Sequence, residues 1–180
     1  DILPYSEIQN GYTRYGGNIP ENIIRLGELT HTQLAQNQKN KVGNMEFIFT
    51  KDITVILNSA PSSNKNFVAF DGSAVYSPVA YIPSIIGIFL SDLLNLTVKD
   101  SLNLTRMMNL VFFVIITYFA IKIAPKSVKF LIAAIALIPM AIHQSSTISA
   151  DGMALSLSLF VISGSLALAM NYKRNILTIT

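Results

Sequence analysis

Apolar positions are concentrated in the second half of this 180-residue chain, where long apolar runs alternate with short polar turns. Leu104–Ile123 is an almost continuous apolar run, and Phe130–Ile142 and Met153–Met170 follow it. A helix needs about 20 apolar residues to cross a bilayer. We therefore expect three membrane spans, at about residues 104–123, 128–145 and 151–171.

The stretch His143–Gly152, HQSSTISADG, separates the last two apolar runs. Two apolar helices joined by a short polar turn predict a membrane hairpin. Asp151, at the end of this turn, is the only acidic residue among the last 80 residues. The turn is therefore the natural place to look for chemistry in the membrane region, residues 77–180.

A further apolar stretch, Val79–Leu96, is short, and it carries Pro83 near its start and Asp92 near its end. It is either a marginal span or a juxtamembrane helix, at about residues 78–96, that lies in the membrane interface. The short length, the proline and the aspartate favour the interface. Tyr76 and Tyr81 suit the belt of aromatic side chains at headgroup depth.

The first 76 residues are more polar, and we read residues 1–17 as loop with a short helix over Ser6–Tyr12. Pro20–Leu34 predicts a helix, with Asn18 as its cap and the proline in its first turn. For Met45–Leu57, two strands around a turn and a single helix both stay open, because the periodicity does not separate them. The predicted fold class is all-α: a polytopic integral membrane protein with an extracytoplasmic loop region, residues 1–76.

The charges follow the same division. Residues 1–76 hold six Lys/Arg and seven Asp/Glu, whereas residues 77–180 hold seven and three. The net charge of +3 is spread over loops and forms no basic face, so no nucleic-acid partner is expected. The chain lacks cysteine, which excludes disulfides and thiolate chemistry. It begins without methionine and ends just after an apolar run, which indicates a piece of a longer protein.

The lysines predict an orientation. The loop Lys122–Lys129 holds three lysines, the C-terminal end holds Lys173 and Arg174, and the turn 144–150 holds none. Cytoplasmic loops of membrane proteins are enriched in Lys and Arg, so the turn is expected outside. Residues 1–76 lie outside too if the 78–96 helix stays in the interface, and they are cytoplasmic if it crosses.

Three charged or ionisable residues are candidates for the site, each with a plainer alternative. Asp151 is suited to an acid–base or metal-binding role, or it only meets the positive end of the 151–171 helix dipole. Arg106 is suited to holding a phosphate, or it is an interfacial anchor at a helix start. His143 is a proton relay or ligand, or simply a polar helix end.

Tyr76, Tyr81 and Pro83 suit a groove for a sugar or lipid, or an aromatic belt followed by a helix-start proline. The chain has no phosphate-binding loop, no nucleophile elbow, no HExxH motif and no glycine-rich dinucleotide loop. The common soluble enzyme classes that depend on those motifs are therefore not indicated.

Several of these features together resemble a known family. They are Tyr-Ser-Pro-x-x-Tyr-x-Pro at Tyr76–Pro83, an arginine that opens the next helix, Arg106, and the spacing of proline and serines that ends at Asp151. The chain resembles the bacterial polytopic membrane proteins grouped as domain-of-unknown-function family 2142, from about residue 67 to residue 170.

That family is in turn similar to the C-type glycosyltransferases, which take a sugar from a polyprenyl-phosphate donor. The resemblance implies a membrane-embedded protein of cell-surface glycan assembly in the bacterial cytoplasmic membrane, with residues 1–76 and 144–150 outside. In such a protein Arg106 would hold phosphate, and Asp151 would act electrostatically or through a divalent metal ion. The acidic base that such enzymes carry after their first span has no counterpart here. A non-catalytic transporter or scaffold of envelope biogenesis is the alternative.

Overall fold

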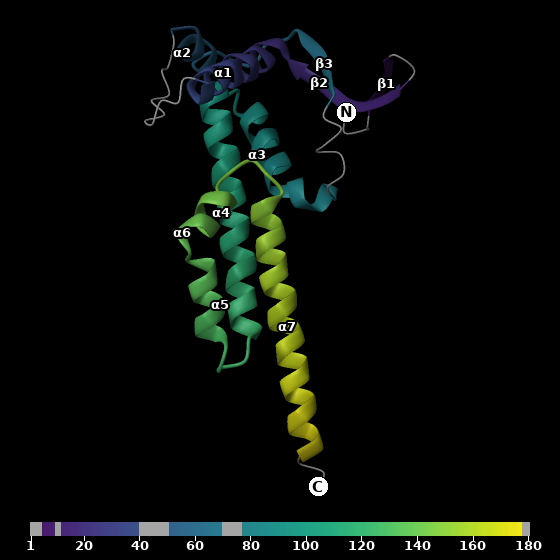
Figure 1. The fold of residues 1–180 in the computed structure, drawn as a ribbon, viewed down its shortest axis with the longest axis vertical. Helices are drawn as coiled ribbons and strands as arrows, with labels where there is room; N and C mark the ends of the chain where they lie inside the picture. Colours follow the sequence, from purple (N-terminus) through teal and green to yellow (C-terminus); the bar gives the residue numbers. More distant parts are fainter. Residues whose placement is uncertain (1–4, 10–11, 40–50, 70–76, 178–180) are drawn as a thin grey trace. The chain divides into compact units, whose positions relative to one another are not determined.

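The computed structural model describes residues 5–9, 12–39, 51–69 and 77–177 of the chain (Figure 1). The chain divides into two compact units. The first unit comprises residues 1–76 and 94–101, and the second unit comprises residues 77–93 and 102–180. Within the described residues, strands occur only in the first unit, and the second unit is helical.

The first unit contains a three-stranded antiparallel sheet in the order β1-β2-β3. The described chain is mostly helical, as predicted, but this sheet departs from the all-α prediction, and strands replace the helix expected over Ser6–Tyr12. Gln9 pairs with Tyr12, and the two residues between them in the sequence are Asn10-Gly11. An Asn-Gly pair between β-forming residues is a strong hairpin signal, and it explains the sheet. The strands are β1, Tyr5–Gln9, β2, Tyr12–Pro20, and β3, Lys65–Ala69.

Helix α1, Glu21–Lys39, follows β2 directly, in the region where the sequence predicts a helix. Its start is not capped by Asn18 as expected, because Asn18 lies within β2 and pairs with Phe67. Asn22 instead connects the helix to the loop that precedes β3, because its side-chain amide donates to the Ala60 carbonyl oxygen at 2.9 Å. The backbone N–H of Glu21 also donates to Asn64 O, at 2.9 Å.

Helix α2, Lys51–Leu57, decides one of the open alternatives, since this part of the 45–57 stretch is helical. Residues 45–50 lie outside the described residues. Ile53 and Ile56 are the buried side chains of α2, three residues apart on one face. A spacing of three residues between apolar positions is typical of a helix. Two such positions are too few to distinguish a helix from strands in the sequence.

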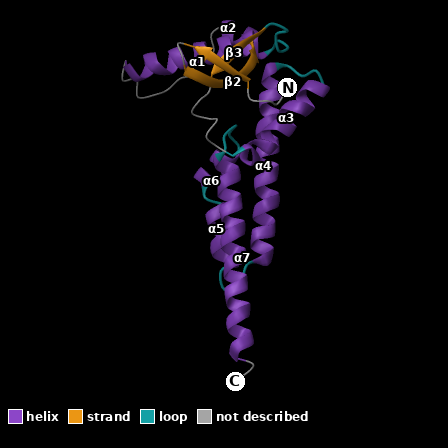
Figure 2. Cartoon of the chain, turned by 90° about the vertical axis from the view of Figure 1, so that its right-hand side faces the viewer, coloured by secondary structure: helices purple, strands orange, loops and turns teal. Residues whose placement is uncertain are grey.

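The second unit is built from helices, and α4, α5 and α7 run alongside one another in both views (Figures 1 and 2). Two of the described helices, α4 and α7, are long and apolar enough to cross a membrane. The elements are η1, Pro78–Tyr81, α3, Ile82–Leu93, α4, Val98–Ile123, α5, Lys129–Ala136, α6, Pro139–Ser145, and α7, Asp151–Leu177.

Helix α4 begins six residues before the predicted start of its span, at a local cap. The backbone N–H of Asp100 donates to Thr97 Oγ1 at 3.3 Å, and the Thr97 hydroxyl donates to the Asp100 carboxylate at 2.8 Å. Threonine three residues before an acidic side chain is a typical helix start. The apolar run begins only at Leu104, so it does not predict the first turns of α4.

The helix predicted over residues 128–145 is wrong as a single element, because the chain forms α5 and α6 with Leu137 and Ile138 between them. Pro139 is the first residue of α6. Proline has no N–H to donate and its ring collides with the preceding turn, so it ends α5 and suits the start of α6. Whether these two helices together make a third crossing stays a prediction.

Burial in the second unit reverses the pattern of a soluble protein. Large apolar side chains such as Phe89, Tyr118 and Phe130 are exposed. The buried polar side chains of this unit all carry hydroxyl groups: Ser84, Ser91, Thr105, Thr117, Ser145, Ser156 and Ser163. A bilayer solvates apolar side chains on the outside, and small residues let helices approach closely. The distribution fits helices surrounded by lipid.

Two glycines lie at close helix contacts. A Cβ atom on Gly87 of α3 would lie 2.6 Å from the Thr105 Cα atom of α4, and one on Gly152 of α7 would lie 2.5 Å from the Ser145 Cα atom of α6. In both places the neighbouring atom is backbone, which has no freedom to move aside. Only glycine permits these helices to approach so closely.

We predict that Gly87→Ala loosens the α3–α4 contact, because the added methyl group collides with backbone. Overpacking of this kind costs about 1–3 kcal/mol of folding free energy. The measurement is the thermal unfolding midpoint of the purified protein in detergent. Gly164→Ala is the matched control, since its Cβ would meet only the Ile123 Cδ1 atom at 3.7 Å. Equal midpoints for the two variants would contradict the packing argument.

Candidate functional site

The polar turn between α6 and α7 is closed by its own hydroxyl groups. Ser146 Oγ donates to His143 O at 2.8 Å, and Thr147 Oγ1 donates to Gln144 O at 2.6 Å. These carbonyl groups belong to the last residues of α6, where a helix leaves its carbonyl oxygens without intrahelical partners. The serine- and threonine-rich sequence of the turn therefore has a local structural cause.

Two side chains of α4 bind the backbone of the turn. Arg106 donates from Nε to Ser146 O at 3.1 Å, and Asn109 donates from Nδ2 to Thr147 O at 2.7 Å. Positions three residues apart lie on the same face of a helix, so both side chains reach the same segment. The turn is thereby held against α4 at two successive carbonyl groups.

Asn109 also joins α3 to this arrangement. Its Oδ1 atom accepts a hydrogen bond from Ser84 Oγ at 3.0 Å, while its Nδ2 atom donates to the turn. An asparagine amide can accept through its oxygen and donate through its nitrogen at the same time. We call the set Ser84, Asn109 and Thr147 the amide bridge, because one amide connects α3, α4 and the α6–α7 turn.

Arg106 is exposed, and its Nε atom is bound to the turn. The apolar run Leu104–Ile123 predicts Arg106 at the start of a helix, where the helix dipole disfavours a positive charge. Since α4 begins at Val98, Arg106 lies beyond the first two turns, where that effect has faded. Among the described residues, its contact with Ser146 is the one hydrogen bond recorded for it, and it uses Nε.

Asp151 is the first residue of α7 and is exposed. Its carboxylate therefore lies at the positive end of the helix dipole, which agrees with the purely structural role considered for this residue. Ser149 Oγ lies 3.4 Å from both the backbone nitrogen and the Oδ2 atom of Asp151. These contacts place Asp151 within the turn's own hydrogen-bond pattern.

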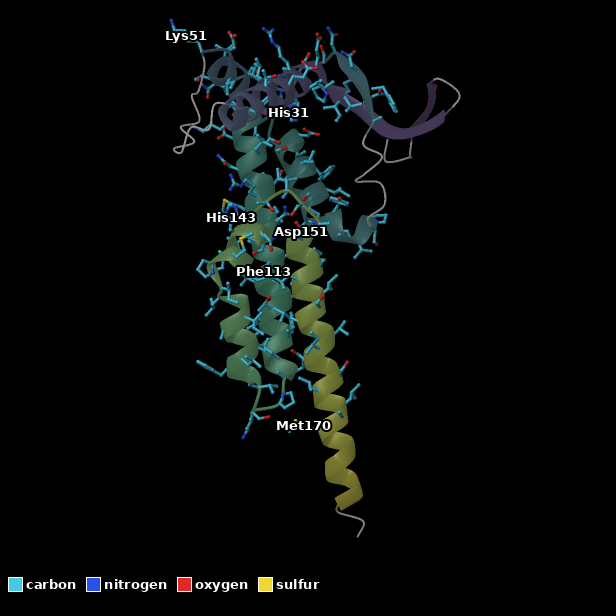
Figure 3. All side chains as sticks on the ribbon, viewed as in Figure 1. His31, Lys51, Phe113, His143, Asp151 and Met170 are labelled. Atoms are coloured by element: carbon cyan, nitrogen blue, oxygen red, sulfur yellow. The ribbon has the colours of Figure 1, made fainter. Side chains whose placement is uncertain are left out.

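His143 and Tyr81, which were also expected at the site, lie on elements other than α4 and α7. His143 is exposed on α6, and Figure 3 shows it on a different element from Asp151 at the same end of the second unit. Tyr81 is half-buried in η1. Tyr76 lies outside the described residues. Among the described residues, no hydrogen bond or ion pair joins the side chain of His143 or Tyr81 to that of Arg106 or Asp151, although η1 packs against α7.

The described residues do not fit a divalent metal ion. No group of three or more His, Asp or Glu side chains that would hold a metal occurs in the described ranges. Asp151 has serine and threonine neighbours in its turn, and hard cations prefer several carboxylate or carbonyl oxygens in one place. We therefore derive no step from a metal ion.

A separate cleft of about 500 Å³ lies in the first unit, between α1 and strands β2 and β3. Its lining is mostly apolar and includes Glu28, His31 and Thr32. His31 is exposed. The cleft shares no residue with the turn of the second unit.

Ser84 and Asn109 were not predicted as site residues from the sequence. A signal existed for Asn109, because an amide inside the apolar run Leu104–Ile123 is costly in a bilayer unless it finds partners. Ser84 had no such signal, since a serine in an apolar helix commonly bonds to its own backbone. Only the packing of α3 on α4 turns it into a partner of Asn109.

We predict that Asn109→Ala destabilises the second unit, because it removes both bonds of the amide bridge and leaves Ser84 Oγ without this acceptor. A loss of about 1–3 kcal/mol is expected for buried polar groups that lose a partner. Thermal unfolding in detergent measures it. Asn103→Ala, at an exposed position on the same helix, is the matched control. A shift as large for Asn103→Ala as for Asn109→Ala would refute the bridge.

Comparison with known proteins bears on the membrane character of the chain. No curated protein and no solved structure matches it. The sequence model of one family, described as "Predicted membrane protein (DUF2142)", matches residues 36–179. The resemblance based on Tyr76–Pro83, Arg106 and Asp151 is thus confirmed at the level of the family. The chain belongs to the membrane protein family DUF2142.

Proposed function

We propose that the end of the second unit with Arg106 binds the phosphate group of a lipid-linked substrate. In its full form the proposal is a glycosyltransferase-like protein that uses a polyprenyl-phosphate-linked sugar in cell-surface glycan assembly. The observation that carries it is the geometry of Arg106. The resemblance to C-type glycosyltransferases suggests the sugar and the glycan, and the arginine suggests the phosphate.

Arg106 supports phosphate binding because one of its nitrogens is engaged and the rest of the group is exposed. A guanidinium group carries five N–H donors in a rigid plane. The bond from Nε to Ser146 O orients that plane and leaves the fork of Nη donors, which matches two phosphate oxygens. A lysine in the same place would supply charge without this orientation.

Asp151 is the second residue of the proposal, in an electrostatic role. It is the carboxylate of the turn whose backbone Arg106 binds, and no ion pair between the two is recorded among the described residues. A carboxylate that stays free of a cation can orient a hydroxyl group or a leaving group near a bound phosphate. The proposal places the turn 144–150 and residues 1–76 on the outside of the bacterial cytoplasmic membrane.

A transporter or scaffold is the second candidate, and the break between α5 and α6 favours it. Interrupted helices occur at membrane depth where backbone groups line a cavity or a path for a solute. Pro139 supplies such an interruption on the element that leads to the turn. This candidate needs no phosphate at Arg106, which separates it from the first.

We predict that Arg106→Gln weakens the binding of a polyprenyl-phosphate lipid and that Arg106→Lys weakens it less. Loss of a bidentate charged contact corresponds to about 1.5–3 kcal/mol, or about 10- to 100-fold in affinity. The measurement is binding of the lipid to the purified protein, with production of surface glycan in cells as the second readout. Lys122→Gln, at the other end of α4, is the control.

The outcomes separate the candidates. Normal binding by Arg106→Gln would remove the arginine from the proposal. Intact binding with lost glycan in Asp151→Asn would support the electrostatic role of the carboxylate. Normal glycan in both variants at normal expression would favour the transporter or scaffold.

The orientation has its own prediction, tested with single cysteines, because this chain has none. We expect cysteines at the exposed positions Asn64 and Ile148 to react with a membrane-impermeant thiol reagent added outside, and one at Ser127 to react only after the membrane is opened. Labelling of Asn64 and Ile148 from opposite sides would show that residues 1–76 and the turn do not share a compartment.

A further inference from the structure

Helix α3 has two faces of opposite character. Its buried side chains are small, namely Pro83, Ser84, Gly87 and Ser91, and Gly87 and Ser84 contact α4. Its outward face carries large apolar side chains, and Phe89 is 65% exposed. We call this outward set the α3 outer face: Ile82, Ile85, Ile88, Phe89 and Leu93.

This distribution does not suit a helix that floats on the membrane surface. An interfacial helix keeps a charged or polar face toward water. The one charged residue of α3 is Asp92, in its last turn, and both of its serines are buried on the protein side. Along most of its length, α3 therefore has no polar face that could be turned toward water.

We propose that lipid acyl chains cover the α3 outer face, so that α3 is inserted in the hydrocarbon of the bilayer. The surface is continuous in character with that of α4, to which α3 is packed and which is long and apolar enough to span a membrane. Exposed apolar side chains of α4, such as Met107, Val111 and Val114, form that neighbouring surface. The inference rests on membership of a membrane protein family and does not depend on the proposed substrate.

The register of the two helices sets the depth. Gly87 lies against Thr105 and Ser84 bonds to Asn109, so α3 and α4 are antiparallel. The exposed large apolar side chains of α4 begin at Leu102 and end at Ile123. At 1.5 Å per residue this band is about 30 Å long, the thickness of the hydrocarbon.

The amide bridge then lies inside the bilayer. Asn109 is seven residues beyond Leu102, or about 10 Å below the start of the apolar band. Arg106 is four residues beyond Leu102, or about 6 Å below it, from where a long arginine side chain can reach the headgroup phosphates.

The test uses a nitroxide label on a single cysteine in the protein reconstituted into lipid vesicles. Oxygen, which dissolves in hydrocarbon, and a water-soluble nickel chelate each relax the label where they collide with it. Phe89→Cys reports on the α3 outer face, and exposed Val114 of α4 and Val55 of α2 supply the lipid and first-unit reference labels. Ile85→Cys tests the register, because it lies one turn deeper than Phe89.

The expected ratio of oxygen to nickel relaxation is higher at Phe89→Cys and at Ile85→Cys than at Val55→Cys. It rises from Phe89→Cys to Ile85→Cys and is highest at Val114→Cys, which lies deepest in the apolar band. Strong relaxation by nickel at both α3 positions would place the face in water and overturn the proposal. Weak relaxation by both reagents would show a covering protein surface, from another part of the protein or a second copy, and would overturn it as well. Either result leaves the phosphate-binding measurement on Arg106 unaffected.

Discussion

The close approach of helices through residues without bulky side chains is the constraint on which the second unit depends. Helices in a bilayer gain nothing from leaving water, so they associate through packing and hydrogen bonds. Gly87 and Gly152 bring α3 onto α4 and α7 onto α6 at distances that a Cβ atom would not allow. The large apolar side chains are left on the outside, where lipid solvates them.

The polar contacts follow from that approach. Ser84 reaches Asn109 because Gly87, less than one turn away, lets the two backbones come together. Asn109 in turn reaches Thr147, and Arg106 reaches Ser146, so the α6–α7 turn is attached to α4 by two side chains. A cation that is oriented and exposed, next to a turn with a carboxylate, is the arrangement from which the proposed phosphate site is argued.

Prediction from the sequence was best where one physical signal dominates. The apolar runs indicated α4 and α7, and the polar stretch HQSSTISADG indicated the turn before Asp151. It failed where local chemistry competes with a broad pattern. Asn10-Gly11 predicts the β1–β2 hairpin although the surrounding residues look like loop, and Pro139 interrupts an apolar run that otherwise resembles one helix.

The sequence by itself determined that this is a membrane protein, where its apolar segments lie, and which family it belongs to, because hydropathy and motifs are properties of consecutive residues. Only the tertiary structure decided that Ser84, Asn109 and Thr147 meet, that Arg106 engages the turn through Nε, and that α3 turns its large side chains outward. These facts depend on which helix faces approach one another across 25 to 40 residues of chain, and no local pattern encodes that choice.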